Sequence, residues 1–201
     1  MLAWKFFAAG AVAPFTGVPW PLPSESAHAE WVEGAPGDGK GVHACSVEDL
    51  PYWFDQELWR VELGGPVTRS GRQLVARRGR LVGRVATWPE AQDEFTRGCI
   101  ERTRRRVLDG LLQAGRAEDA QRLAAEHELD AQRDAAFAIA ASGPAFAGYL
   151  FDAIRRQPYP GLCAYIAANA AAAQDGRRGH DVERTTQVQW LAKHLALTRD
   201  D

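Results

Sequence analysis

The stretch 73-QLVARRGRLVGRVATWPE-90 passes from one kind of structure to another, and the fold class follows from it. Its first part mixes short apolar runs with arginines, a pattern typical of a strand. Its last part, "TWPE", predicts the start of a helix. Thr87 is a suitable N-cap, Pro89 is tolerated in a first turn, and Glu90 stands at the third helical position. A β-rich segment is therefore expected to end, and a helical one to begin, near residue 88.

The composition on either side agrees with this boundary. Five of the seven tryptophans and most of the prolines precede residue 88, whereas alanine, arginine and glutamate dominate after it. We expect an α+β protein, with a small mixed or antiparallel sheet in a β-rich domain over residues 1–87 and an α-helical region over residues 88–201.

Four segments of the first half are predicted to be strands. Trp59, Val61 and Leu63 alternate with polar residues, as in a strand with one buried face. Glycine and proline in "GGPVTRSG" (64–71) indicate a loop, and residues 19–40 form a long connection that could cover a site. The expected strands are residues 2–8, 40–45, 57–63 and 73–86, the last broken at Gly79.

The second half is predicted to be a series of helices. The first continues from "TWPE" to about Ala114 and ends at Gly115. Proline and glycine pairs separate several of the later helices. These are expected near residues 117–127, 130–141, 144–156, 160–173 and 181–196.

Bulk properties restrict the class of partner. The 201 residues carry a net charge of −2, which favours neither non-specific binding of nucleic acid nor attraction to an anionic membrane. No apolar run approaches the roughly 20 residues that span a bilayer. The apolar N-terminus is interrupted by glycine and proline from Gly10 onward, so a signal peptide is not expected. Three widely spaced cysteines without a CxxC pair indicate reduced thiols, and we expect a cytoplasmic protein.

The stretch 41-GVHACSVEDLPYW-53 holds a candidate site. His43 and Cys45 stand two apart on a predicted strand and therefore share a face. They could be a base and a nucleophile, or two metal ligands, but no third ligand or orienting acid stands nearby. The alternative is structural, with Cys45 as a small buried residue and His43 hydrogen-bonded in the core. Ser46 is expected to cap a short helical turn.

Two further groups of residues have a functional and a structural interpretation. Large aromatic side chains could line a pocket for a flat ligand or could form the core. The run 102-RTRRR-106 could contact phosphate or could be a solvated helix face. The aromatic set comprises Trp4, Phe6, Trp20, Trp31, Tyr52, Trp53 and Trp59.

The order of the first-half motifs resembles known families. "AWKFF", "GVHACSVEDLPYW", "LWRVELGGPV" and "LVARRGRLVGRV" look like an uncharacterised bacterial and phage domain family marked by Gly-apolar-His-Ala-Cys. More distantly, residues 1–88 resemble the small rifamycin-type ADP-ribosyltransferases. That resemblance implies an ADP-ribosyltransferase-like sheet with a cleft for NAD, and it leaves the helical half unexplained.

The departures from the transferase pattern concern the residues that would hold NAD. His43 stands where those enzymes carry a tyrosine, while "VELGGP" at 61–66 is similar to their next motif. Trp-Lys-Phe at 4–6 replaces their His-Gly-Thr, and the acid after the Gly-Pro loop is missing. The resemblance therefore implies a remodelled cleft, and whether NAD or any other cofactor binds stays open.

Two functions follow as hypotheses. The first is a small-molecule enzyme or ligand-binding protein whose polar groups are Lys5, His43, Tyr52 and Glu62, with His43 as acid or base and Glu62 as its orienter or a charge stabiliser. The second is a non-catalytic interaction or regulatory module that binds a protein partner through its Ala-rich helices. Nucleic acid is not an expected partner.

Overall fold

The computed structural model describes residues 1–24, 28–34 and 41–197 of the chain. The chain forms two compact units. Unit 1 comprises Met1–Ala91 together with Val188–Asp201, and unit 2 comprises Gln92–Gln187. Unit 1 holds an antiparallel sheet and unit 2 is helical, so the α+β fold expected from the sequence is confirmed.

Within the described residues the sheet has five strands, all paired antiparallel. The neighbours follow the order β1-β4-β5-β2, and β3 also pairs with β5. Each of the four predicted strand segments contains a strand, although residue 40 lies outside the described part of the chain. The strands are β1 (Leu2–Phe7), β2 (Val32–Glu33), β3 (Val42–Ala44), β4 (Glu57–Ser70) and β5 (Gln73–Arg84).

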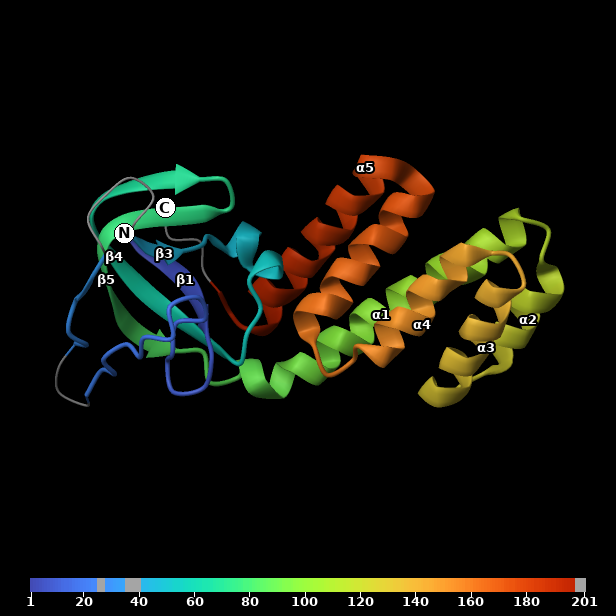
Figure 1. Ribbon diagram of the computed structural model, residues 1–201, viewed down its shortest axis with the longest axis horizontal. Helices are drawn as coiled ribbons and strands as arrows, with labels where there is room; N and C mark the ends of the chain where they lie inside the picture. The colour runs from blue at the N-terminus through green and yellow to red at the C-terminus, as the bar shows by residue number, and fades with distance from the viewer. Residues whose placement is uncertain (25–27, 35–40, 198–201) are drawn as a thin grey trace. The chain divides into compact units, whose positions relative to one another are not determined.

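The sheet curls until β1 and the end of β3 meet. The backbone N–H of Cys45 donates to the carbonyl oxygen of Trp4 at 2.7 Å, and the N–H of Trp4 donates to the carbonyl oxygen of Cys45 at 2.9 Å. β1 is thus joined to β4 on one edge and to the end of β3 on the other, inside the bent β4–β5 hairpin (Figure 1). This closure places two segments that are forty residues apart in the sequence side by side.

β4 is longer than its hydrophobic pattern predicts. The register between β4 and β5 shifts at Arg60/Val61 and again between Gly64 and Val67. The prediction of a loop over residues 64–71 is wrong, because the Gly65-Pro66 pair is accommodated as an irregularity inside the strand. Gly65 has a φ of 85°, in the left-handed region that glycine tolerates.

The predicted break at Gly79 is also wrong, because β5 is continuous through it. Gly79 pairs with Leu63 of β4 on one side and with Val32 of β2 on the other. A Cβ here would lie 2.7 Å from a methyl carbon of Val42 and 3.1 Å from the ring of Trp20. Glycine therefore permits the close approach of other chain segments to the strand.

The core of unit 1 lies on the inner face of the curled sheet. Trp59, Val61 and Leu63 are all buried, so the alternation predicted for this strand is confirmed. Ala3 and Phe7 of β1 pack in the same cluster.

A short 3-10 helix, η1 (Val47–Tyr52), follows β3 and is held to the β4–β5 hairpin by Asp49. The buried Asp49 carboxylate accepts hydrogen bonds from Arg69 and from the Ser46 hydroxyl, the latter at 3.0 Å. Ser46 therefore does not cap η1 with its side chain as predicted. Its hydroxyl donates to the carboxylate three residues on.

Unit 2 is built from helices, two of which, α1 and α5, also extend into unit 1. Gly115, with a φ of 71°, follows the end of α1 as predicted. None of the helices in the described part of the chain is both long and apolar enough to cross a membrane. The helices are α1 (Trp88–Gln113), α2 (Ala117–Ala125), α3 (Leu129–Ala141), η2 (Ala145–Ala147), α4 (Gly148–Arg155) and α5 (Pro160–His194).

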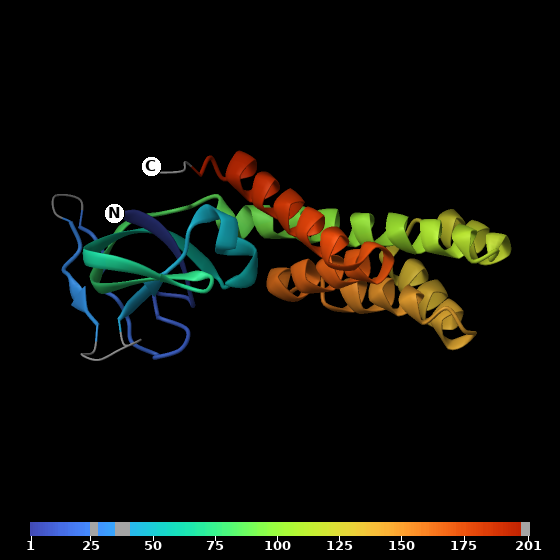
Figure 2. The ribbon, with the colours of Figure 1, turned by 90° about the horizontal axis from the view of Figure 1, so that it is seen from above.

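α5 is two helices joined by a sharp kink. Asp175 and Gly176 have non-helical backbone angles, and Gly176 has a φ of 58°. The halves turn back on one another (Figure 2), and the side-chain amide of Gln187 donates to the carbonyl oxygen of Ala164 at 3.0 Å. Two helices are therefore present as predicted, with a shorter connection than expected.

The arginine run of α1 serves the packing of unit 2. Arg102 and Arg106 face the carboxylate of Glu183, which is buried, with Arg102 Nε at 2.9 Å from Oε1. Arg104 donates to carbonyl oxygens at the end of α2, whereas Arg105 is exposed and pairs with Glu101 on its own helix. Only Arg105 fits the solvated face, and Arg102 and Arg106 share the buried Glu183 carboxylate as their counter-ion.

Candidate functional site

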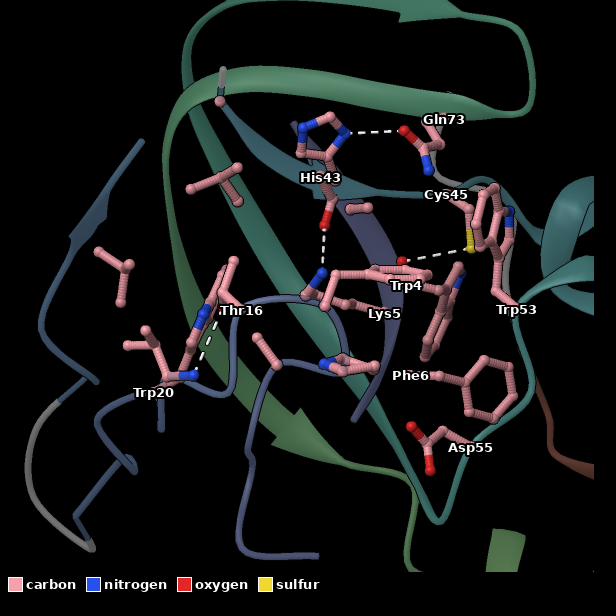
Figure 3. Close-up of a pocket in the computed structure, with 18 of the residues that line it drawn as sticks. Trp4, Lys5, Phe6, Thr16, Trp20, His43, Cys45, Trp53, Asp55 and Gln73 are labelled. Atoms are coloured by element: carbon pink, nitrogen blue, oxygen red, sulfur yellow. Dashed lines mark hydrogen bonds between the residues drawn. The ribbon is translucent and has the colours of Figure 1, made fainter. Parts of the chain in front are cut away.

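A pocket of about 700 Å³ opens in unit 1. β1 and β3 form its floor, the loop over residues 13–20 forms one wall, and residues 52–55 after η1 form another (Figure 3). The pocket lies where β1 and β3 separate beyond the paired Trp4 and Cys45. The closure of the sheet therefore creates the pocket. The two strands are joined at Trp4 and Cys45 and leave space between them beyond that pair.

Lys5 is the cation of this pocket. Its Nζ donates to the carbonyl oxygen of His43 at 2.8 Å, bridging the separating strands. The Nζ also lies 5.3 Å from the ring centre of Phe7 and 5.8 Å from that of Trp20. Burial lowers the pKa of Lys5 from 10.5 to about 8, because an ammonium group loses hydration in apolar surroundings. No ion pair of Lys5 with a carboxylate occurs among the described residues.

His43 contributes its backbone and its ring to different contacts. Figure 3 shows the carbonyl group of His43 directed at Lys5 and its imidazole directed at Gln73. Nδ1 lies 2.7 Å from Oε1 of Gln73. Because a side-chain amide oxygen only accepts, Nδ1 is the nitrogen that donates, which leaves Nε2 as the acceptor of a neutral ring. Both His43 and Gln73 line the pocket.

Glu62 is not among the residues that line this pocket. On β4 it accepts a hydrogen bond from Nε of Arg80 at 2.7 Å, and Arg80 also stacks on Trp31 with its guanidinium carbon 4.6 Å from the ring centre. The sheet therefore brings Lys5, His43 and Tyr52 together and places Glu62 in a separate ion pair. The carboxylates that line the pocket are Glu33 and Asp55, which the sequence patterns do not indicate.

Tyr52 and Trp53 end η1 at the pocket wall. The guanidinium carbon of Arg72 lies 3.6 Å from the ring centre of Tyr52, and the indole N–H of Trp53 donates to the carbonyl oxygen of Arg72 at 3.2 Å. The turn between β4 and β5 thus fixes both aromatic side chains. Phe15, on the facing loop, packs edge-on against Trp53 and is 83% exposed.

The aromatic set divides between the functional and the structural interpretations. Trp59 is buried in the core and Trp31 stacks between Arg78 and Arg80, so these two do not line the pocket. The members that line it are Trp4, Phe6, Trp20, Tyr52 and Trp53.

Glu57 positions the loop wall, a role that no sequence pattern indicates. Its carboxylate accepts from the N–H of Gly10 at 3.3 Å, from the N–H of Ala11 at 3.1 Å and from the indole of Trp59 at 2.9 Å. Burial opposes the charge, yet these hydrogen bonds and Arg84 lower the pKa of Glu57. The fixed turn allows the chain to reverse after β1, where Ala8 pairs with Val12.

Cys45 does not form a dyad with His43. Its Sγ is buried and donates to the carbonyl oxygen of Trp4 at 3.4 Å, and burial raises the pKa of its thiol far above the ordinary value. A thiol held neutral is a poor nucleophile and a poor metal ligand. Among the described residues, no three histidine, cysteine, aspartate or glutamate side chains are grouped to hold a metal ion.

Comparison with known proteins leaves the resemblance to both families as a prediction. No family model, no curated protein and no solved structure matches this chain.

Proposed function

We propose that unit 1 binds, and acts on, a small flat apolar molecule in the pocket between β1 and β3. The observation that supports this most is the juxtaposition of Lys5 with aromatic side chains in a pocket of about 700 Å³. Small-molecule sites are typically of this size, mainly apolar, with few polar groups that fix orientation. The ligand would place an acceptor atom at Lys5 and its ring among Trp4, Phe6 and Trp20.

In this proposal His43 is the candidate acid or base. Its hydrogen bond to Gln73 orients the imidazole and fixes which nitrogen donates. Charge stabilisation by Glu62 would need a ligand that extends beyond the pocket, because its carboxylate is engaged by Arg80. Within the pocket, Asp55 and Glu33 are better placed for that role.

A remodelled ADP-ribosyltransferase-like cleft is the form of this proposal that includes NAD. The aromatic walls suit a nicotinamide or adenine ring, whereas Lys5 is the group in the position of the missing NAD-holding motif. NAD and ADP-ribose therefore belong among the first ligands tested. We also propose that the protein works in the cytoplasm, because its three cysteines are free thiols.

A fluorescence-monitored thermal unfolding screen tests the proposal. All seven tryptophans lie in unit 1, so their fluorescence reports the unit that holds the pocket. A ligand that binds only the folded state raises the melting temperature by mass action. Aromatic acids, aromatic carbonyl compounds, nucleotides, NAD and ADP-ribose are the compounds to screen.

Matched variants then locate the site. A ligand that binds the pocket should lose its shift in Gln73→Ala and Lys5→Met and keep it in Glu62→Gln, whose side chain lies outside the pocket. Equal shifts in all three variants would place the ligand elsewhere. A screen with no shift from any compound class would count against the proposal.

An exposed apolar ridge at the start of α5 and on the residue before it favours a second candidate, a protein-interaction module. Tyr159, Leu162 and Tyr165 follow one another at three-residue spacing and are 59%, 40% and 57% exposed. In a two-fold dimer the same apolar patch of both copies meets, so a second copy of the chain is the partner we propose to test. Light scattering at rising concentration should show a dimer that Tyr165→Glu dissociates. A monomer at all concentrations would reject this candidate.

A further inference from the structure

Lysine is rare in this chain, and one of its lysines lies in the pocket. The 24 basic residues include only three lysines, Lys5, Lys40 and Lys193. Lys193 is exposed in the last turn of α5, and Lys40 lies outside the described residues. Arginine carries the other basic positions, including the ion pairs of both units. Arginine stays protonated in proteins, whereas a buried lysine can lose its proton. The choice of lysine at position 5 therefore indicates that a neutral amine is used there.

The surroundings of Lys5 favour a neutral amine. The described residues supply one backbone acceptor to its Nζ, from His43, and no carboxylate. With a pKa of about 8, a substantial share of the amine is unprotonated near neutral pH, on the order of a hundredfold more than for an exposed lysine. A neutral amine has two N–H groups and a lone pair. One N–H is used by the His43 carbonyl oxygen, and the lone pair is available for a nucleophilic attack.

The geometry points to a reaction class. We propose that Lys5 forms an imine with an aromatic or conjugated aldehyde or ketone bound in this pocket. The inference rests on the proposed small-molecule function and names its substrate class.

The reaction balances without another reagent. The Nζ lone pair attacks the carbonyl carbon, and a proton passes from nitrogen to oxygen to give a carbinolamine. The carbinolamine hydroxyl takes up a proton from the solvent as the C–O bond breaks, so the oxygen leaves as water and a C=N bond forms whose nitrogen keeps its proton. Hydrolysis reverses every step, so no oxidant or reductant is consumed.

The product fits the contacts around Nζ of Lys5. A protonated imine keeps one N–H, and one carbonyl oxygen, that of His43, lies at hydrogen-bond distance of Nζ. The rings of Phe7 and Trp20 lie within 6 Å of Nζ and present electron-rich groups to the cation that forms. Aromatic walls beyond them suit the flat, conjugated part of the carbonyl compound.

Reductive trapping tests the proposal. The full chain is incubated with 2-naphthaldehyde and cyanoborohydride near pH 7.5, and the adduct is located by peptide mass spectrometry. We expect at least a tenfold excess of the reduced adduct at Lys5 over Lys193, because the pocket holds the aromatic aldehyde beside Lys5 and burial raises the neutral share of the Lys5 amine. Lys5→Arg should abolish the pocket adduct, whereas Lys193→Arg should leave it unchanged. The trapping rate should rise with an apparent pKa near 8.

A non-carbonyl analogue separates this inference from the proposed function. Binding of 2-naphthalenemethanol, measured by tryptophan quenching, reports the pocket alone. Binding of the alcohol together with a Lys5 adduct supports both proposals. Alcohol binding with no adduct, or with equal labelling of Lys5 and Lys193, overturns the imine and leaves the pocket function. A Lys5 adduct without alcohol binding supports the imine and counts against reversible ligand binding. Absence of both results overturns both proposals.

Discussion

Lys5 should destabilise the folded chain at neutral pH. Its pKa falls from 10.5 to about 8 because burial removes hydration from the ammonium group. At about 1.4 kcal/mol per pKa unit, the folded state loses roughly 3 kcal/mol relative to an unperturbed lysine. The hydrogen bond to His43 returns about 1 kcal/mol. Lys5→Met, a neutral side chain of similar length, should therefore raise the free energy of unfolding by about 2 kcal/mol at pH 7.

The sign of the pH dependence follows from the two pKa values. Between about pH 8 and 10.5 the unfolded chain binds a proton at Lys5 that the folded chain does not. The stability of the wild type therefore rises with pH through this window, by the linkage relation. The advantage of Lys5→Met should shrink by about 2 kcal/mol between pH 7 and pH 10.

Urea unfolding at several pH values, followed by tryptophan fluorescence, measures this difference. Other titrating groups act on both proteins alike and cancel when the two curves are subtracted. Lys193→Met is the matched control, because Lys193 is exposed and the same substitution there removes a lysine that does not line the pocket. A Lys5→Met variant that is less stable than the wild type at pH 7, or an advantage that does not change with pH, would refute the reasoning.

Three further perturbations probe other parts of the chain. Glu183→Gln should lower the stability of unit 2 by about 3 kcal/mol, because Arg102 loses its buried counter-ion. Thermal unfolding followed by circular dichroism at 222 nm measures this loss, and an unchanged melting curve would contradict it. Gly179→Ala should destabilise the same unit by about 1–3 kcal/mol, because its Cβ would lie 2.9 Å from a backbone carbon of Ala171, whereas Gly148→Ala, whose Cβ would lie 4.0 Å from that of Ala140, should be neutral or stabilising. If both alanine variants melted together, the close approach at Gly179 would be wrong. The three cysteines are buried with raised pKa values and should react with a thiol reagent at pH 8 only after unfolding; rapid reaction of the native chain would contradict the burial.

Local patterns were sufficient for much of the fold. The alternation at Trp59, Val61 and Leu63 predicted both a strand and its buried face, since that pattern has the period of the backbone itself. The "TWPE" stretch predicted where α1 begins, and Gly115 where it ends. The extension of β4 through Gly65 could not be predicted, because the irregularity depends on pairing with β5, which is remote in the sequence.

The candidate site was predictable only in part, for a related reason. Lys5, His43 and Tyr52 are polar groups on or next to strands, and the structure gathers them at one pocket. Their meeting depends on the Trp4–Cys45 closure, which no local pattern encodes. Glu62 was predicted as a site residue from motif similarity alone. In the structure it pairs with Arg80 on the neighbouring strand and does not line the pocket.

The final residues of the described chain have a consequence for biosynthesis. Residues from Val188 onward belong to unit 1, and Leu191, Leu195 and Leu197 are buried. A ribosome releases unit 2 in full before it releases these leucines, so the helical unit can fold while the sheet still lacks part of its surroundings. Unit 1, although most of it is synthesised first, is therefore the unit whose last buried residues are synthesised last.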